Sequence, residues 1–255
     1  MLAASPLRAE RVTADYVVQA MGVTVLEVRT VLDTDERGYG IEFTSRLVGL
    51  PATLMGEGRQ TTRATGTWTA AGVQPVSYVG QGTWRGDPRR TVLSWDGNRP
   101  VVRDLLPPNT AEREEVPEAA RRGTVDSLSA VAFLIRQVQR EQRCEATTTV
   151  YDGRRLTQMS ARTARWEMLP PVRGEWSGRA LRCEFEGRLT AGFRSGDNPA
   201  EAGRPQPGTA WLAEVSPGAI IPVRLEIPSR WFGTMSAHLV TARVGTEEAR
   251  AQPRR

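Results

Sequence analysis

The stretch Leu181-Arg182-Cys183-Glu184-Phe185-Glu186-Gly187 alternates between apolar or small residues and charged ones. Successive side chains of a β-strand point to opposite faces of the sheet, so the odd positions are predicted to face a core and the even positions solvent. The same alternation recurs over most of the chain, between turn signals such as Asp96-Gly97-Asn98 and Asp152-Gly153. Asx-Gly pairs favour tight hairpins because they tolerate positive φ. The sequence therefore predicts a mainly β protein made of antiparallel strands.

Further segments share this period of two or a strand-like composition. A strand at 221–228 contains Pro222 and Pro228, and because proline cannot donate to a β-ladder we predict that this strand lies at a sheet edge. The remaining predicted strands span residues 13–19, 23–32, 39–48, 59–69, 75–84, 90–95, 144–151, 155–165, 209–215 and 234–244.

One segment breaks the β period. Between residues 124 and 142, apolar residues recur at steps of three and four, which predicts an amphipathic helix. Thr124 or Asp126 can cap its start, and arginines near its end complement the helix dipole. The apolar stripe is broad, so we expect sheet to cover it on more than one side. The stripe comprises Leu128, Val131, Ala132, Ile135 and Val138, widened by Phe133 and Leu134.

Length and composition favour one globular domain. The chain has 255 residues, of which 39% are hydrophobic and 25% charged, and all-β domains of this size are common. We predict a single β-rich domain over residues 11–245, followed by a disordered polar tail at 246–255. Two segments rich in Pro, Gly or Glu, at 106–123 and 195–208, are predicted to be exposed loops.

The charge pattern argues against nucleic-acid binding. The net charge is +5, but the 34 basic residues, all arginine, come singly or as doublets among 29 acids. A nucleic-acid site usually needs clustered positive charge. No stretch approaches the roughly 18 apolar residues of a membrane span, so no span is predicted.

The residue inventory offers no catalytic or metal site. His238 is the only histidine and the two cysteines are far apart in sequence, so no zinc-type ligand spacing occurs and no cofactor is expected. No nucleophile elbow precedes a helix, and His238 lies on a predicted strand between Ala237 and Leu239, where a structural role is usual. The sequence therefore predicts a protein that is not an enzyme. A pair of carboxylates acting on a polymer stays open as an alternative.

Aromatic residues are the candidates for a ligand site. Trp84 and Trp95 end predicted strands beside Gly or Asp, where an aromatic side chain can line a groove. The alternative is that the tryptophans only fill the core. The predicted ligand-lining set is Trp68, Trp84, Trp95 and Trp211.

Several motifs, in their order, resemble a known bacterial family. They are Asp126-Ser127-Leu128-Ser129-Ala130, the pair Cys144 and Cys183, residues 150–154 between them, and Gly208 to Ala213 running into Ile221-Pro222-Val223-Arg224. From about residue 12 to 244 the chain resembles the family called domain of unknown function 3108. In that family the helix opens with Asp-Pro-Leu-Ser-Ala, whereas here Ser127 replaces the proline, which is only a preference at a helix start.

The resemblance implies an exported protein with an antiparallel sheet, and it carries no catalytic residue. By analogy we expect a strongly curved sheet or half-barrel, like periplasmic lipoprotein carriers, with the amphipathic helix packed in its concavity. The expected function is a periplasmic, non-enzymatic binding or carrier module for a lipid-like or lipoprotein ligand. The alternatives are an envelope structural or assembly partner with a packed interior, and a hydrolase acting on envelope polymer.

The first residues support export. Residues 1–10 resemble the tail of a secretory signal, and Leu7-Arg8-Ala9 offers Leu at −3 and Ala at −1 of a cleavage site. The charged start of such a signal is missing, so we expect an upstream extension and cleavage near Glu10. A frayed terminus is the alternative.

Two cysteines with no third suit a single disulfide, and both fall on strand positions predicted to be apolar. An oxidising periplasm would keep a bridge between Cys144 and Cys183 closed. Two inert buried thiols are the alternative.

Overall fold

The computed structural model describes residues 10–49, 52–53, 58–70, 72–84, 86–229 and 233–245. The predicted signal remnant around Leu7-Arg8-Ala9 and the predicted tail at 246–255 lie outside these residues. The first seven strands are β1 (Glu10–Ala20), β2 (Val23–Thr34), β3 (Gly38–Leu47), β4 (Arg59–Thr69), β5 (Gly72–Trp84), β6 (Asp87–Asp96) and β7 (Arg99–Leu106). The other six are β8 (Ala146–Tyr151), β9 (Leu156–Leu169), β10 (Gly178–Ala191), β11 (Gln206–Ser216), β12 (Ala219–Ser229) and β13 (Gly233–Gly245).

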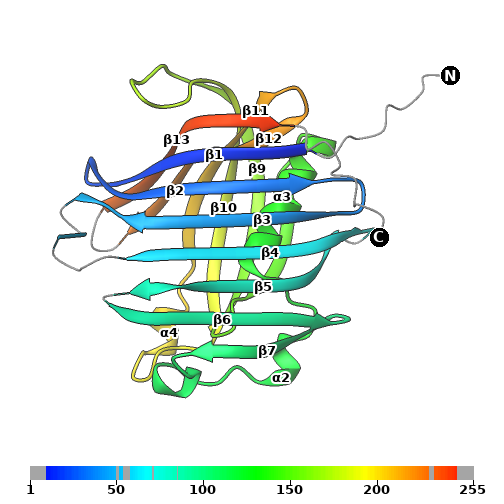
Figure 1. Cartoon of the computed structure of the whole chain (residues 1–255), viewed down its shortest axis with the longest axis vertical. Coiled ribbons are helices and arrows are strands. Elements are labelled where there is room, and N and C mark those ends of the chain that lie inside the picture. Colours follow the sequence, from blue (N-terminus) through cyan, green and yellow to red (C-terminus); the bar gives the residue numbers. More distant parts are fainter. Residues whose placement is uncertain are drawn as a thin grey trace, which may run out of the picture.

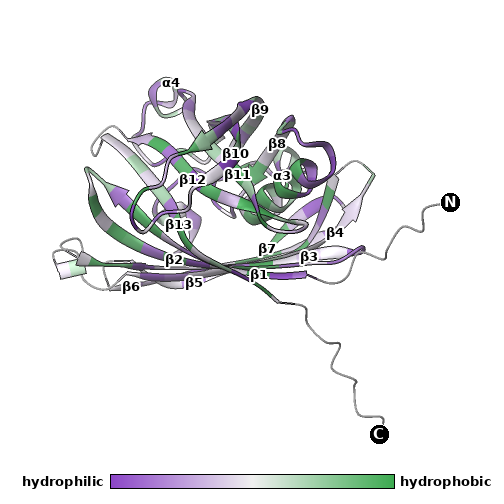
Figure 2. Cartoon of the chain, turned by 90° about the horizontal axis from the view of Figure 1, so that it is seen from above, coloured by the Kyte–Doolittle hydropathy of each residue, from purple (hydrophilic) through white to green (hydrophobic). Residues whose placement is uncertain are grey.

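All of these strands form one antiparallel sheet, in the order β7-β6-β5-β4-β3-β2-β1-β13-β12-β11-β10-β9-β8. Each half of the chain is a meander, and pairing of β1 with β13 joins the two halves. The sheet is not closed, and β7 and β8 are its edges. Figure 1 shows the first meander face on, and Figure 2 shows the second meander bending over it. The predicted mainly β, antiparallel architecture is confirmed.

The predicted helix is present as α3 (Ser127–Glu141) and lies between the two halves of the sheet (Figure 2). It contacts β3, β4, β5, β8 and β12. Its residues Ala132, Ile135 and Val138 are buried in the main hydrophobic core, together with side chains from both meanders. The periodic apolar spacing produces this face, but Val131 does not belong to it, because its side chain is 39% exposed.

A buried hydrogen-bond chain fixes the start of α3. Asp126 is the N-cap, and its side chain accepts a hydrogen bond from the backbone N of Ser129 at 2.9 Å. The Ser129 hydroxyl donates to the same carboxylate, and the Tyr39 hydroxyl of β3 donates to Ser129 Oγ at 2.6 Å. Burial raises the pKa of Asp126, although these hydrogen bonds oppose the shift. The helix is therefore tied to the first meander by polar contacts as well as by packing.

A second, smaller core joins β6 to the turn between β8 and β9. It contains Leu93, Val116, Tyr151 and Leu156. Gly153 in that turn has φ +91, and a Cβ added to it would lie 2.7 Å from the Thr91 side chain. Both the backbone conformation and the close approach require glycine there. The turn can thus approach the edge region of the first meander, although no ladder links β7 to β8.

One strand was predicted at the wrong place in the sheet, and another was not predicted. Strand β12 is internal, between β11 and β13. Its Pro222 is accommodated because the ladder with β11 shifts register between Trp211 and Leu212, and such irregularities tolerate a missing N–H donor. The predicted loops contain the short helices η1 (Asn109–Ala111), α2 (Glu118–Arg121) and α4 (Pro199–Ala202), and β7 was not predicted as a strand.

Candidate functional site: a cavity beside the central helix

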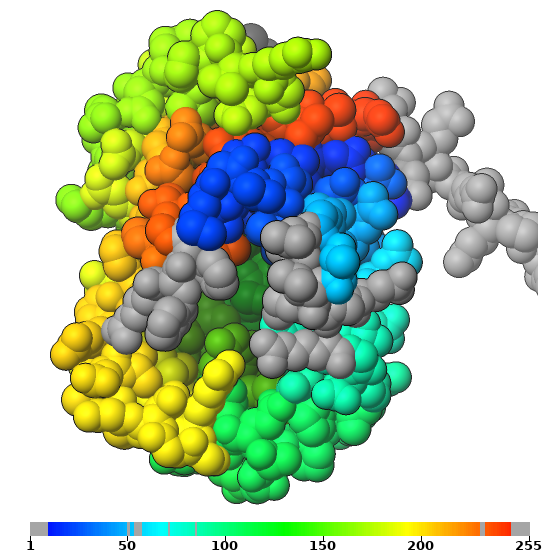
Figure 3. Space-filling model, turned by 90° about the vertical axis from the view of Figure 1, so that its left-hand side faces the viewer, coloured from blue at the N-terminus to red at the C-terminus, as the bar shows by residue number. Residues whose placement is uncertain are grey.

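A cavity of about 1260 Å³ lies between α3 and the sheet. Its wall includes residues from both meanders, from α3 and from the turn between β8 and β9. Figure 3 shows a hollow on the face where the β1–β2 turn lies, with green segments from the middle of the chain in its depth. Enclosed voids larger than a water molecule are rare in protein cores, but this space is not enclosed, because it opens to solvent at the hollow.

Much of the wall is apolar. Helix α3 contributes the exposed Val131 and the half-buried Leu134, and the wall also includes Ile135, which is buried in the core. From the second meander, Ala210 and Leu212 both line the cavity because they are two residues apart on β11. Other large apolar side chains of the wall include Leu26, Leu47, Phe133, Met159, Phe185, Leu225 and Ile227.

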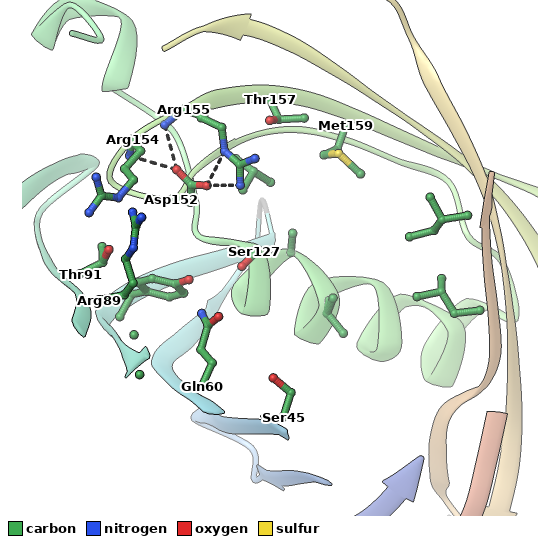
Figure 4. A pocket seen from close by; sticks show the side chains of 18 of the residues that line it. Ser45, Gln60, Arg89, Thr91, Ser127, Asp152, Arg154, Arg155, Thr157 and Met159 are labelled. Carbon is green, nitrogen blue, oxygen red and sulfur yellow. Dashed lines mark hydrogen bonds and ion pairs between the residues drawn. The ribbon is translucent and has the colours of Figure 1, made fainter. Parts of the chain in front are cut away.

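The end of the cavity near the start of α3 is polar and charged. Figure 4 shows Arg89, Arg154 and Arg155 gathered there with Asp152, close to Ser127. One carboxylate oxygen of Asp152 accepts hydrogen bonds from the backbone N of Arg154 at 3.0 Å and of Arg155 at 2.8 Å. The other accepts from Arg155 Nε at 2.8 Å. The Asp152-Gly153 hairpin, predicted from sequence as a turn, thus also positions the guanidinium group of Arg155.

Arg154 is the most buried of these arginines, with a side chain 13% exposed. Its Nη2 donates to the carbonyl oxygens of Leu106 at 2.9 Å and Pro107 at 2.8 Å. Its Nη1 lies 3.6 Å from Glu112 Oε2, and this buried atom has no hydrogen-bond partner among the described residues. Burial lowers the pKa of Arg154. Glu112 also forms an ion pair with Arg89, whose Nη1 is 2.7 Å from Glu112 Oε1.

Of the tryptophans predicted to line a ligand site, only Trp84 is part of the cavity wall, where its side chain is 45% exposed. Trp68 packs against Tyr39 in a tilted arrangement, with ring centroids 4.8 Å apart, and Trp95 Nε1 donates to the carbonyl oxygen of Thr124 at 3.1 Å. Trp211 is buried, donates to Glu167 and lies between Arg182 and Arg224. These three tryptophans do not line the cavity; their rings are occupied in packing.

The predicted cysteine pair is at disulfide distance. The Cα atoms of Cys144 and Cys183 are 5.9 Å apart, and both side chains are fully buried. Cys144 follows the end of α3, and Cys183 lies on β10, so the pair connects the helix to the second meander. This contact lies in the main core.

His238 has structural partners. Its Nδ1 lies 2.8 Å from Glu175 Oε2 and its Nε2 lies 2.9 Å from Ser236 Oγ. Burial lowers the pKa of this histidine, which opposes the attraction of Glu175. Within the described part of the chain, no group of three or more His, Cys, Asp or Glu side chains could hold a metal ion. No helix there is long and apolar enough to cross a membrane.

The sequence reasoning missed the charged end of the cavity. Its arginines come from segments far apart in the chain, and only the doublets Arg89-Arg90 and Arg154-Arg155 hinted at it. The arginines are dispersed in the sequence, and the fold brings several of them to one place.

A family profile described as Protein of unknown function (DUF3108) matches residues 13–240. A search among curated proteins found no match. The matched range contains α3, both cysteines and every residue of the cavity wall. The cavity therefore lies within the part of the chain that the family profile describes.

Proposed function

The chain belongs to the DUF3108 family, whose function is unknown, and we propose that it is a non-enzymatic binding or carrier module for an amphiphile. The ligand is a lipid-like molecule or the acyl chain of a lipoprotein, and the compartment is the periplasm. The cavity between α3 and the sheet is the observation that carries this proposal.

Size and chemistry both support it. Ligand pockets usually measure about 300–1,000 Å³ and are mostly apolar with a few polar groups. The cavity here is slightly larger, at about 1260 Å³, and combines an extensive apolar wall with one charged end. Apolar side chains lining an open space are costly unless something covers them. An acyl chain would cover the partly exposed side chains of Val131, Leu134 and Phe185 without any change of fold.

The arrangement of the sheet agrees with this function. A bent sheet with a helix between its halves (Figure 2) is the arrangement that we liken to the half-barrels of periplasmic lipoprotein carriers. The rival proposal, an assembly partner with a fully packed interior, predicts that this cavity binds no lipid, and the binding experiment below separates the two. No observation favours a hydrolase.

Filling the cavity should abolish binding. A fluorescent fatty-acid probe is expected to bind the protein with micromolar affinity, about −8 kcal/mol. Val131→Trp places a large side chain at an exposed cavity position and should weaken probe binding about tenfold or more, because the ring occupies the volume that the ligand needs. The melting temperature should stay close to that of the parent, since Val131 is not packed in the core.

Val240→Trp is the matched control, because Val240 is 43% exposed on β13 and is not part of the cavity wall. It should leave probe binding unchanged. Native mass spectrometry of protein purified from its own host should also detect co-purified lipid. Absence of binding by every lipid class would favour the packed-interior alternative.

Export is proposed from the sequence. Fractionation of the native host should place the protein in the periplasm, and N-terminal sequencing of the mature form should start near Glu10. An uncleaved protein in the cytoplasm would contradict the proposed compartment and, with it, the oxidising environment expected for the cysteine pair.

A further inference from the structure

The charged end of the cavity gathers arginines from separate segments. Strand β6 contributes one, the segment after η1 one, the β8–β9 turn two, and the segment after β10 one. Arg59 and Arg90 also border the cavity, but they lie at strand positions whose side chains point to the other face of the sheet. Arg90 pairs with Asp104 at 2.8 Å. The arginine cluster is therefore defined as Arg89, Arg113, Arg154, Arg155 and Arg194.

Positive charge is in excess in this cluster. Among the described residues of the cavity wall, its five arginines face two carboxylates, Glu112 and Asp152. Asp197 lies outside the wall, and its carboxylate accepts a hydrogen bond from the backbone N of Arg194 at 3.2 Å. Counting Asp197 as well still leaves an excess of two positive charges. The chain as a whole carries +5, so a large part of its surplus charge is gathered at this end of the cavity.

The excess is unfavourable without a ligand. Burial lowers the pKa of Arg113, and Arg155 and Arg194 lower it further. Like charges held close together repel one another unless a counter-charge offsets them, although Arg155 and Arg194 are exposed and solvent screens part of this repulsion. In addition, Arg89 Nε and Arg154 Nη1 are buried and have no hydrogen-bond partner among the described residues. These two atoms are enclosed by protein, so an anion in the cavity would instead bind the guanidinium N–H groups that remain exposed on Arg89 and Arg155 and offset their charge.

We propose that the arginine cluster binds the anionic headgroup, a carboxylate or phosphate, of the amphiphile whose chain occupies the apolar part of the cavity. The inference rests on the proposed function and names the class of ligand. Guanidinium groups bind carboxylates and phosphates through paired N–H donors, which favours these anions over neutral headgroups. The apolar wall begins one helical turn away on α3, at Val131, after Ser127 at the charged end.

Four probes of equal chain length test this proposal: palmitate, hexadecyl phosphate, hexadecanol and hexadecyltrimethylammonium. Palmitate or hexadecyl phosphate should bind about tenfold or more tightly than hexadecanol, because hydrogen bonds to charged groups are stronger than neutral ones. The cationic probe should bind most weakly. Raising the ionic strength should reduce the preference. Inorganic phosphate alone should compete poorly, since it lacks the chain.

The variant Arg89→Gln should weaken palmitate binding about tenfold and leave hexadecanol binding within about twofold. Arg155→Gln is a second variant, since its side chain is 48% exposed and its substitution should not disturb folding. Arg46→Gln is the matched control, because Arg46 pairs with Glu27 on the neighbouring strand β2 and is absent from the cavity wall. It should change neither binding constant.

The outcomes separate the two proposals. Binding of none of the four probes would overturn the carrier function and this inference together. Equal binding of all probes, unaffected by Arg89→Gln and Arg155→Gln, would overturn the headgroup inference and leave the carrier function standing. Inorganic phosphate binding as tightly as hexadecyl phosphate would show a site for a free anion, which also overturns the headgroup inference.

Discussion

Replacing Cys144 by alanine is expected to lower the free energy of unfolding by about 4 kcal/mol. The two cysteines are 39 residues apart in sequence, and a bridge over such a loop restricts the unfolded chain strongly in the chain-entropy model. Because Cys144 follows α3 and Cys183 lies on β10, the bridge also holds the helix end against the second meander. Urea unfolding followed by tryptophan fluorescence measures the loss.

Reductant is the control for this prediction. It should destabilise the parent protein by a similar amount and leave Cys144→Ala unchanged. Cys183→Ala and the double variant should lose about as much as Cys144→Ala, since all three remove the same bridge. Thiol titration of the denatured, unreduced protein should find no free thiol; two free thiols would mean that the cysteines are only packed together.

The strands could be predicted because alternation depends on local sequence. Leu181, Cys183 and Phe185 face the interior as their spacing required, and Leu181 and Cys183 are fully buried. The helix followed from a different local period. The internal position of β12 could not be predicted from local sequence. A proline lacks an N–H donor, which favours an edge strand, but the sequence does not show the register shift in the ladder with β11 that accommodates it.

The candidate site depended on contacts that local patterns do not encode. Arg89 and Arg154 are 65 positions apart in the sequence, and only the bend of the sheet brings both to Glu112. The tryptophans illustrate the converse. Trp68 and Trp211 are of the residue type expected in a ligand site. However, the tertiary fold decides which part of a strand lies beside a cavity, and neither of these side chains lines the cavity.

The same limit applies within the helix. Val131 and Ile135 are four residues apart and lie on neighbouring turns, so the periodic pattern assigned both to the core. In the structure Ile135 is 4% exposed, whereas Val131 is 39% exposed toward the cavity. This difference in exposure arises because the sheet covers α3 at Ile135 but not at Val131. It should appear as a difference in the free energy of unfolding when each side chain is truncated.

Ile135→Ala is expected to lower the free energy of unfolding by about 2–5 kcal/mol, as the truncation of a buried aliphatic side chain does. Val131→Ala is the matched comparison, since it removes part of an apolar side chain from the same helix. It should cost less than about 1 kcal/mol, because the lost atoms were not packed. Urea unfolding of both variants, with unchanged denaturant slopes, provides the measurement.

A large loss at Ile135 with a small one at Val131 would place the boundary between core and cavity along α3. Equal, small losses at both positions would mean that the sheet does not cover the helix, and the cavity would then be an open surface. Equal, large losses would mean that Val131 is packed in solution and that the cavity is filled by side chains. Only the unequal result is compatible with a cavity that an amphiphile enters beside a helix held firmly in place.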